Sequence, residues 1–320
     1  IFPLKAWSLG RKILKKSRGS WLISSDSPFE VGFASWLLAR KSRGRFFVQI
    51  HTDFMSPYFR QGSLKDRIRY YLARFVVPRA DCIRTVSERI KRSLLNAWKS
   101  DFPLEVQPPE ITVLPIVTEI DEFFNARRNA ETDERFKNYN FKMVAVGRFV
   151  EKEKNFKMLI DMMLDFMRIC PKAFLVLVGD GPDRVHYESR IKNQGLEKCV
   201  ILEGWRNDLP AFLKSFDLFL MSSNYEGWGR VVIEAMAAGL PVIMTDVGLA
   251  GEIVKSGENG IVVPVGDKEA MLDAVMELYR NKEKKAQFSR KSAELIKKLV
   301  PRTESEYFGM YKNLLTNCLK

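Results

Sequence analysis

The chain contains 320 residues, of which 46% are hydrophobic and 28% are charged, and its formal net charge is +13. This length provides for two domains with separate cores and is large for a single domain. No apolar run approaches the ~20 residues of a membrane-spanning helix, so we expect a soluble protein. The positive charge favours anionic partners, which are phosphates, nucleic acid or lipid headgroups.

The first 21 residues are basic, and apolar side chains such as Trp7, Ile13 and Trp21 are interspersed among the cations. They contain no continuous apolar stretch followed by a small-residue cleavage site, so we do not expect a signal peptide. This segment is expected to lie on an anionic membrane surface or to form a solvated helix flank. The expected location is therefore the cytoplasm, with peripheral attachment to the inner face of the membrane in the first case.

The four cysteines are Cys82, Cys170, Cys199 and Cys318. They are far apart in the sequence and lack the paired spacing of zinc ligands. Such usage is typical of reduced thiols in the cytosol. We therefore expect no disulfide and no metal.

Predicted strands and helices alternate along the first 114 residues. Strands are predicted at residues 20–24, 46–50, 81–86 and 111–114, and helices at residues 29–40, 64–77 and 88–99. Four prolines between residues 103 and 115, and a polar stretch that continues to Glu134, then interrupt the alternation. We place a domain boundary in this region, at residue 122.

The alternation restarts after this boundary. Strands are predicted at residues 142–146, 174–178, 200–203, 218–221 and 241–245, and helices at residues 156–168, 185–194, 209–214 and 231–238. This order predicts an α/β protein with a parallel sheet in each half. Ligands of such sheets bind at the carboxyl ends of the strands, so functional residues should follow the strands directly.

The most informative stretch covers residues 222–245. Its loop contains Glu226, Gly227 and Gly229 and leads directly into a predicted helix. The glycines allow close approach of the backbone to a ligand, and the helix start offers free amide groups and the positive end of a dipole, so a diphosphate fits there. Glu234 follows Glu226 by eight positions. An isolated pair of this kind is more often a loop charge and a solvated helix residue than a pair of hydroxyl ligands.

This stretch resembles the E-x7-E signature of family 4 glycosyltransferases of the GT-B fold, including its E-G-W-G, E-A-M-A-A-G and P-V-I-x-T segments. The resemblance also covers V-Q-I-H-T-D-F at residues 48–54, V-G-R-F-V-E-K-E-K at residues 146–154, V-G-D-G-P at residues 178–182 and L-E-G-W-R at residues 202–206. Taken alone, V-G-D-G-P reads as a tight turn, and a lone histidine is more often structural.

The resemblance implies a catalytic group of His51, Arg148, Lys154 and Glu226. Arg148 and Lys154 would bind the donor diphosphate, while His51 and Glu226 would position the sugar. Glu234 would bind the ribose. The implied donor-binding set is Gly179, Gly181, Gly204, Trp205, Arg206, Gly227, Trp228, Gly229, Arg230, Val231 and Glu234.

The resemblance further implies two Rossmann-like domains that face a cleft, at residues 1–122 and 123–302. A helix at residues 303–320, whose later part has helical spacing of apolar side chains, would return to the first domain. The family begins with a strand and a glycine-rich loop, and neither precedes Ser20. The first domain is therefore expected to be truncated at its amino terminus, which puts the activity of this piece in doubt.

The implied activity is transfer of a sugar, with retention, from a nucleotide diphosphate-sugar to a lipid-linked or saccharide acceptor in cell-surface glycan synthesis. No Asp-x-Asp pair is present, which agrees with a metal-independent enzyme that has no cofactor. The alternatives are a non-catalytic, nucleotide-sugar-binding accessory subunit and a sugar-nucleotide epimerase on the same scaffold. Nucleic acid is not an expected partner, because no recognition motif accompanies the charge.

Overall fold

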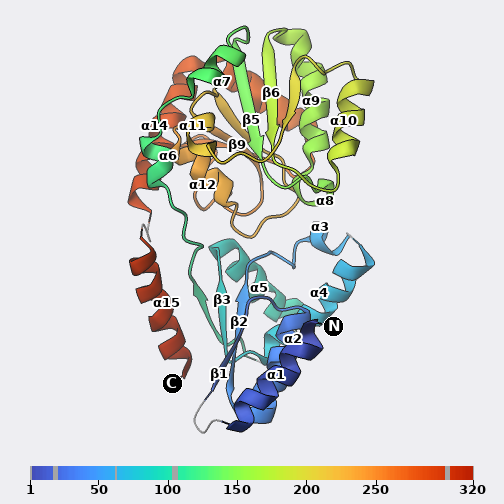
Figure 1. Ribbon diagram of the computed structural model, residues 1–320, viewed down its shortest axis with the longest axis vertical. Coiled ribbons are helices and arrows are strands. Elements are labelled where there is room, and N and C mark those ends of the chain that lie inside the picture. Colours follow the sequence, from blue (N-terminus) through green and yellow to red (C-terminus); the bar gives the residue numbers. More distant parts are fainter. Residues whose placement is uncertain (1, 17–20, 62, 103–106, 300–302, 320) are drawn as a thin grey trace. The chain divides into compact units, whose positions relative to one another are not determined.

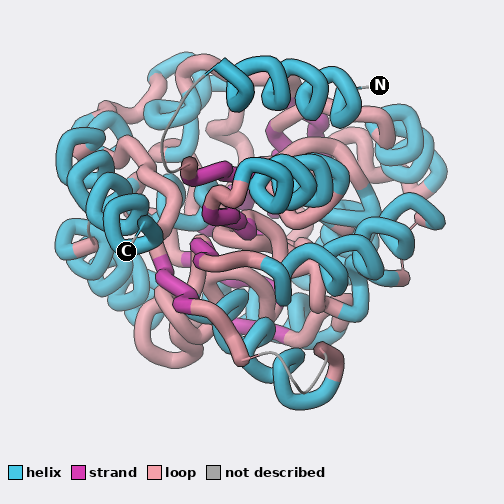
Figure 2. The backbone as a smooth tube through the Cα atoms, turned by 90° about the horizontal axis from the view of Figure 1, so that it is seen from below, coloured by secondary structure: helices cyan, strands magenta, loops and turns pink. Residues whose placement is uncertain are grey.

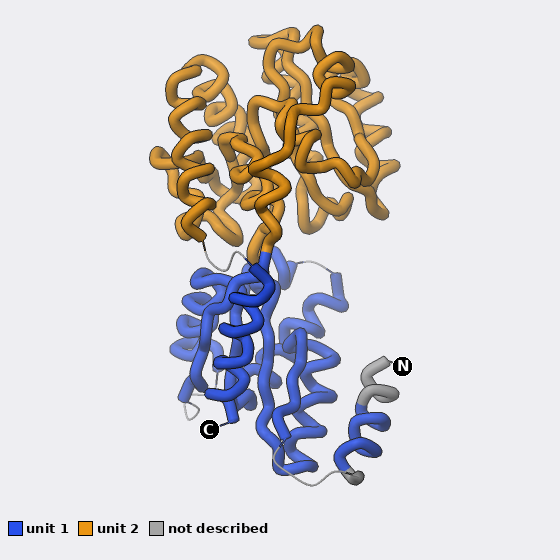
Figure 3. The backbone as a smooth tube through the Cα atoms, turned by 60° about the vertical axis from the view of Figure 1, so that its left-hand side comes forward, with its two compact units in different colours: residues 1–117, 303–320 blue, residues 118–302 orange. Residues whose placement is uncertain are grey.

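The computed structural model describes residues 2–16, 21–61, 63–102, 107–299 and 303–319. The chain divides into two compact units, which are unit 1 (Ile1–Val117 and Thr303–Lys320) and unit 2 (Thr118–Arg302) (Figure 3). Each unit contains a parallel sheet, and helices (cyan) lie outside the strands (magenta) in Figure 2. None of the described helices is both long and apolar enough to cross a bilayer.

The sheet of unit 1 has four described strands in the order β1-β2-β3-β4, all parallel. The strands are β1 (Leu22–Ser25), β2 (Arg45–Ile50), β3 (Cys82–Thr85) and β4 (Glu110–Val113). Successive residues of β2, including Phe46, Phe47 and Val48, are buried, so both faces of this strand are covered. The predicted strand–helix alternation of this half is confirmed.

The helices of unit 1 are α1 (Phe2–Lys16), α2 (Glu30–Ser42), α3 (Pro57–Arg60), α4 (Leu64–Val76), the 3-10 turn η1 (Val77–Arg79), α5 (Glu88–Ser100) and α15 (Glu304–Leu319) (Figure 1). Ser63 and Asp66 start α4 with a capping box: Ser63 Oγ accepts from the Asp66 amide, and Asp66 Oδ2 accepts from the Ser63 amide at 3.1 Å. The start predicted for this helix is confirmed. Residue 1 and residues 17–20 of the basic amino-terminal segment lie outside the described residues.

Helix α15 belongs to unit 1 although it is the last element of the chain. Leu314 packs with Phe47 and Leu114 against the sheet, and Cys318 forms a disulfide with Cys82 at a Cα–Cα distance of 5.8 Å. The expectation of four reduced cysteines is therefore wrong for this pair. The spacing of the cysteines in the sequence did not indicate this pair, because 236 residues separate the two side chains and only the return of α15 brings them together. Cys170 and Cys199 are free and buried.

The sheet of unit 2 has six described strands in the order β10-β9-β8-β5-β6-β7, again all parallel. The strands are β5 (Phe141–Val146), β6 (Ala173–Val178), β7 (Val200–Glu203), β8 (Leu218–Met221), β9 (Val242–Thr245) and β10 (Gly260–Val263). Every residue of β6 and β8 is buried, as expected of central parallel strands. From β5 the chain adds β6 and β7 on one side. It then adds β8, β9 and β10 on the other side of β5.

The helices of unit 2 are α6 (Asp121–Asn125), α7 (Ala130–Arg135), α8 (Glu151–Lys154), α9 (Phe156–Ile169), α10 (Arg184–Asn193), α11 (Leu209–Leu213), α12 (Arg230–Ala237), α13 (Lys268–Arg280) and α14 (Lys282–Lys298). Helices α9 and α13 pack together and share one core cluster with the strands. No element was predicted between residues 246 and 303, where the structure has β10, α13 and α14.

Candidate functional site

The order of strands in unit 2 reverses between β5 and β8. At such a point the loops after two neighbouring strands lead away in opposite directions and leave a crevice for a ligand. The loop after β5 contains Arg148 and leads into α8, which ends at Lys154. The loop after β8 contains Glu226 and Gly229 and leads into α12. The predicted residues thus follow the two strands that flank the reversal.

Lys154 and Glu226 form an ion pair between these two loops. Lys154 Nζ donates to Glu226 Oε1, and Ser223 Oγ donates to the same oxygen at 2.8 Å. Their side chains are only 18% and 13% exposed. The Lys154 stem crosses the end of β5, because a Cβ on Gly147 would lie 3.3 Å from its Cδ and Cε. The ion pair therefore places the Lys154 ammonium group at the carboxyl edge of the sheet.

Small polar residues that the sequence analysis did not single out bond these loops together. Ser222 Oγ donates to the Lys154 carbonyl at 2.7 Å, and the Asn224 amide donates to the Glu153 carbonyl at 2.8 Å. Thr245, the last residue of β9, donates through Oγ1 to the Ser223 carbonyl at 2.7 Å. Their position directly after or at the end of a predicted strand was the signal in the sequence that could have identified them.

Gly179 and Gly181 hold the loop after β6 against the loop after β5. A Cβ on Gly179, where φ is +135°, would lie 2.0 Å from the Gly147 carbonyl oxygen. A Cβ on Gly181 would lie 2.4 Å from the carbonyl oxygen of Phe149. Both glycines are therefore required by contact between two loops, and this requirement holds whether or not a donor binds there.

The loop before α12 is buried and ends in a left-handed glycine. Gly227 and Trp228 are buried, and no hydrogen-bond partner of the Trp228 indole nitrogen lies within the described chain. Gly229 has φ of +85° and is the residue before the first turn of α12. The amides of this turn and the positive helix dipole form an environment suited to an anion.

Glu234 lies one turn inside α12 with its side chain buried. Arg230, an exposed residue at the start of the same helix, donates to Glu234 Oε1 from Nε at 2.9 Å. Burial raises the pKa of the Glu234 carboxyl, and the nearby Arg230 opposes that rise. Val231, the next residue of the helix, is half-buried. If a ribose hydroxyl donated to Glu234, this carboxylate would accept hydrogen bonds from both the ribose and Arg230.

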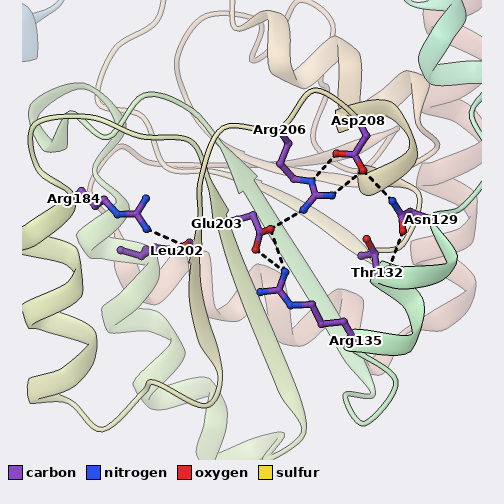
Figure 4. Close-up of polar contacts among 8 residues, drawn as sticks. All are labelled: Asn129, Thr132, Arg135, Arg184, Leu202, Glu203, Arg206 and Asp208. Atoms are coloured by element: carbon purple, nitrogen blue, oxygen red, sulfur yellow. Dashed lines mark hydrogen bonds and ion pairs between the residues drawn. The ribbon is translucent and has the colours of Figure 1, made fainter.

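Arg206 takes part in an ion-pair network after β7 (Figure 4). Its guanidinium donates to Glu203 at 2.7 Å and to both carboxylate oxygens of Asp208 at 2.8 Å. Bonding to Asp208 raises the pKa of Arg206. Arg135 also pairs with Glu203, at 2.9 Å. Two carboxylates thus pair with the Arg206 guanidinium, and none of these hydrogen bonds involves Lys154 or Glu226.

Three other predicted residues are less constrained. Trp205 is 83% exposed, and a Cβ on Gly204 would meet no atom within 4 Å. The Arg148 side chain is exposed and has no hydrogen bond or ion pair within the described parts of the chain. Its guanidinium is therefore free to meet an anion that enters from solvent. No group of three metal-binding side chains is found where the structure is described.

His51 belongs to unit 1, where it directly follows β2. Its side chain is half-buried. Burial lowers the pKa of the imidazole and Arg84 lowers it further, while Asp26 has the opposite effect. The imidazole is therefore held towards its neutral form, which can donate one hydrogen bond and accept another.

The sequence pattern of the family described as "Glycosyl transferases group 1" matches residues 127–295. The chain is 34% identical over 136 residues, 42% of its length, to the lipopolysaccharide core biosynthesis glycosyltransferase LpsE of Rhizobium meliloti. It is 27% identical over 185 residues, 56% of its length, to the UDP-Gal:alpha-D-GlcNAc-diphosphoundecaprenol alpha-1,3-galactosyltransferase of Escherichia coli. These matches span 38% of the first relative and 48% of the second, so the chain covers less than half of either.

The fold is similar to that of Anabaena Alr3699/HepE, solved in complex with UDP, with a TM-score of 0.75 and 20% sequence identity. The match covers 97% of this chain and 82% of the Anabaena chain. The two α/β units, each with a sheet of parallel strands, therefore form a GT-B-like fold.

Proposed function

Because this chain belongs to the glycosyl transferases group 1 family, we propose that it transfers a sugar from a nucleotide diphosphate-sugar to a lipid-linked or saccharide acceptor, with retention of configuration. The observation that carries the proposal is the ion pair of Lys154 and Glu226 at the reversal of the unit 2 sheet. It fixes a cation beside the loop that leads into α12. A leaving diphosphate needs this combination of a cation and aligned amides.

Each residue at this edge of the sheet has a separate part in the proposed reaction. Lys154 and the amides after Gly229 stabilise the charge that develops on the leaving diphosphate, and the exposed Arg148 closes onto it from solvent. Glu226, oriented by Ser223, accepts hydrogen bonds from hydroxyls of the transferred sugar. Glu234 accepts from the ribose. None of these groups is required as a covalent nucleophile.

The acceptor class is supported by the relatives. Their names refer to a lipopolysaccharide core and to a sugar on diphosphoundecaprenol, both of them glycans attached to lipid. We therefore place the chain in the synthesis of cell-surface glycans, with transfer that requires neither a metal nor a cofactor. Undiminished turnover in EDTA and an unchanged anomeric configuration in the product are the expected results.

The test of the proposal begins with a panel of nucleotide sugars in a thermal-shift assay. A donor at 100 times its dissociation constant adds about 2.7 kcal/mol of apparent stability. Any donor that stabilises the chain is then assayed for hydrolysis and for transfer to polyprenyl-diphosphate sugars and free saccharides. Binding without hydrolysis or transfer would instead favour a non-catalytic accessory subunit, and absence of binding to any donor would overturn the proposal.

A further inference from the structure

Arg84 of β3 is a buried cation whose hydrogen-bond acceptors are all neutral. The residue is only 3% exposed and lies near the carboxyl end of its strand. Its guanidinium donates to the Leu114 carbonyl at 3.0 Å, to the Pro115 carbonyl at 3.2 Å and to Gln49 Oε1 at 2.7 Å. No carboxylate pairs with it among the described residues, and burial lowers the pKa of the guanidinium. A buried charge without a counter-ion is costly, which indicates a functional role.

The pairing of β2 with β3 brings this charge beside His51. The two strands are parallel, and Gln49 lies directly opposite Arg84 in their register. His51 follows Gln49 by two positions, which is the spacing that returns a side chain to the same face of a sheet. Burial lowers the pKa of the His51 imidazole, and the positive charge of Arg84 lowers it further. The cation of β3 and the histidine after β2 therefore interact at the carboxyl edge of the unit 1 sheet.

Two aromatic rings of α15 lie against the Arg84 guanidinium. Its carbon is 5.7 Å from the ring centres of both Tyr307 and Tyr311. Phenol rings carry no formal charge at neutral pH, so they do not neutralise the cation. The flat fork of donors is thus held by β2, by the segment after β4 and by α15, and an ammonium group could not reproduce this geometry.

Asp26 is the opposing charge at this edge of the sheet. It is exposed and directly follows β1. Its negative charge raises the pKa of the His51 imidazole, but by less than Arg84 lowers it. Solvent and salt screen an exposed charge more strongly than a buried one, which agrees with this order.

Two other acidic groups near these strand ends have partners of their own. Asp53, in the loop after β2, accepts from Ser93 Oγ at 3.2 Å. Burial raises the pKa of Asp53, while Ser93 and Arg89 lower it. Glu30, at the start of α2, forms an ion pair with Arg69 of α4 at 2.9 Å. Neither acid is among the charges that shift the titration of the imidazole.

We propose that Arg84 is a positioning residue of the transfer reaction, which acts through His51 by means of a buried charge held at the strand ends. A fixed cation beside the imidazole favours its neutral form. The neutral ring keeps one nitrogen free to accept a hydrogen bond from a hydroxyl of the donor sugar, and the protonated ring has no such acceptor. This role rests on the proposed function, whereas the effect of Arg84 on His51 can be measured without any transfer.

The test begins with NMR titration of the histidines. The sequence contains two, His51 and His186, so a histidine-labelled chain gives two imidazole titrations and His186→Gln assigns them. Arg84→Gln should move the His51 midpoint to higher pH. Arg84→Lys should leave the midpoint close to that of the wild type, because both variants lose the guanidinium fork but only Arg84→Gln loses the charge.

Asp26→Asn tests the same balance with the opposite sign and changes an exposed residue. Loss of this carboxylate should lower the His51 midpoint. Arg45→Gln is the matched control, since Arg45 is exposed at the amino end of β2 and should leave the midpoint unchanged. Thermal unfolding checks that the variants are folded. An unchanged midpoint in Asp26→Asn would overturn the proposal even if Arg84→Gln did not fold, because charges at this edge would then not control the imidazole.

The pH profile of kcat connects the charge to transfer. With a donor and an acceptor that give product, the acid limb should move to higher pH in Arg84→Gln and stay near that of the wild type in Arg84→Lys. An unchanged His51 midpoint in Arg84→Gln, or an equal rise in Arg84→Lys, would overturn the proposal and leave the proposed function intact. A shifted midpoint with an unmoved acid limb would also overturn it. Absence of product with every donor would instead defeat the proposed function, and the positioning role with it.

Discussion

The loops after the strands of unit 2 are bonded to each other directly, whereas the strand ends of unit 1 are bonded to each other and also contact a helix from the far end of the chain. In unit 2, Ser222 donates to the Lys154 carbonyl at 2.7 Å, and the loops after β5 and β6 touch at Gly179. In unit 1, Arg84 of β3 donates to the carbonyls of Leu114 and Pro115 at 3.0 and 3.2 Å. The same guanidinium lies 5.7 Å from the rings of Tyr307 and Tyr311 of α15.

This difference predicts which substitutions affect the site of unit 2 and which affect the stability of unit 1. Unit 2 is one continuous segment, so its site should respond to substitutions within its own loops. Unit 1 is assembled from two segments that join through α15. Its stability should therefore also depend on the contacts of α15 with the sheet and on the disulfide between Cys82 and Cys318. Substitutions in each unit test this contrast.

The largest effect is expected at the charged pair of unit 2. Lys154→Ala should lower the donor-saturated rate of transfer by about 10²–10³-fold, because one stabilising group of the leaving diphosphate is lost. The same change leaves the mostly buried Glu226 without its cation, so urea unfolding should also show reduced stability. Steady-state turnover and urea titration measure the two effects.

Arg148→Ala provides the cleaner separation of function from stability. Its side chain is exposed and has no partner in the described structure, so turnover should fall while the unfolding midpoint stays unchanged. Lys172→Ala is the control. This exposed lysine precedes β6, so it lies at the amino ends of the strands, opposite the candidate site. Normal turnover in the Arg148 or Lys154 variant would show that its assignment to the diphosphate is wrong.

The second test substitutes two glycines of unit 2 that follow neighbouring strands. Gly179→Ala should cost about 3 kcal/mol of unfolding free energy, because φ is +135° and the new Cβ would collide with the Gly147 carbonyl. Gly204→Ala should change stability by less than about 1 kcal/mol, because it meets open space and has no positive φ. Urea titration compares the two, and equal losses would contradict the loop contact.

The third test addresses the covalent bond of unit 1. Cys318→Ser should lower the free energy of unfolding by about 2 kcal/mol, because the bond to Cys82 closes a very long loop of the unfolded chain. Urea titration with and without reductant measures the effect.

Thiol counting in denaturant tests the same bond without a substitution. Two free thiols, those of Cys170 and Cys199, are expected in the oxidised chain. Adding reductant should raise the count and shift the unfolding midpoint of the wild type to that of the variant. Four free thiols before reduction would mean that the original expectation of reduced cysteines was correct.

Much of the fold could be predicted because local patterns determine it. The apolar runs of β7 and β8 gave the observed bounds, and the capping residues Ser63 and Ser87 begin α4 and α5. Helix α13 was also predictable, since Met271, Leu272 and Val275 have helical spacing and are buried. This spacing is local and needs no tertiary contact to be recognised.

The candidate site was less accessible from the sequence because its contacts join distant residues. The positions of Lys154 and Glu226 after strands were predicted, but their mutual pairing, across 72 residues, depends on the order of the strands. The disulfide of Cys82 likewise requires the return of α15. Arg206 was predicted from the motif alone, and the competing carboxylates of Glu203 and Asp208, although near in sequence, were not weighed.

The smallest effect is expected at His51, the candidate that unit 1 contributes. The folded pKa lies below the ordinary value of 6.5, mainly through burial, so below pH 6.5 the unfolded chain binds more protons at this residue than the folded chain. The contribution of His51 to stability is therefore complete above this pH and is lost as the pH falls towards the lowered pKa. His51→Gln removes that dependence.

The stability difference between wild type and His51→Gln should consequently shrink as the pH is lowered through this window in urea titrations. His186→Gln, which changes the other histidine, on the exposed side of α10, is the control substitution. A constant difference for His51 would mean that the pKa of its imidazole is the same in the folded and the unfolded chain. Burial would then give no preference to the neutral form, which is the form that can accept a hydrogen bond from a sugar hydroxyl, the role that its place after β2 favours.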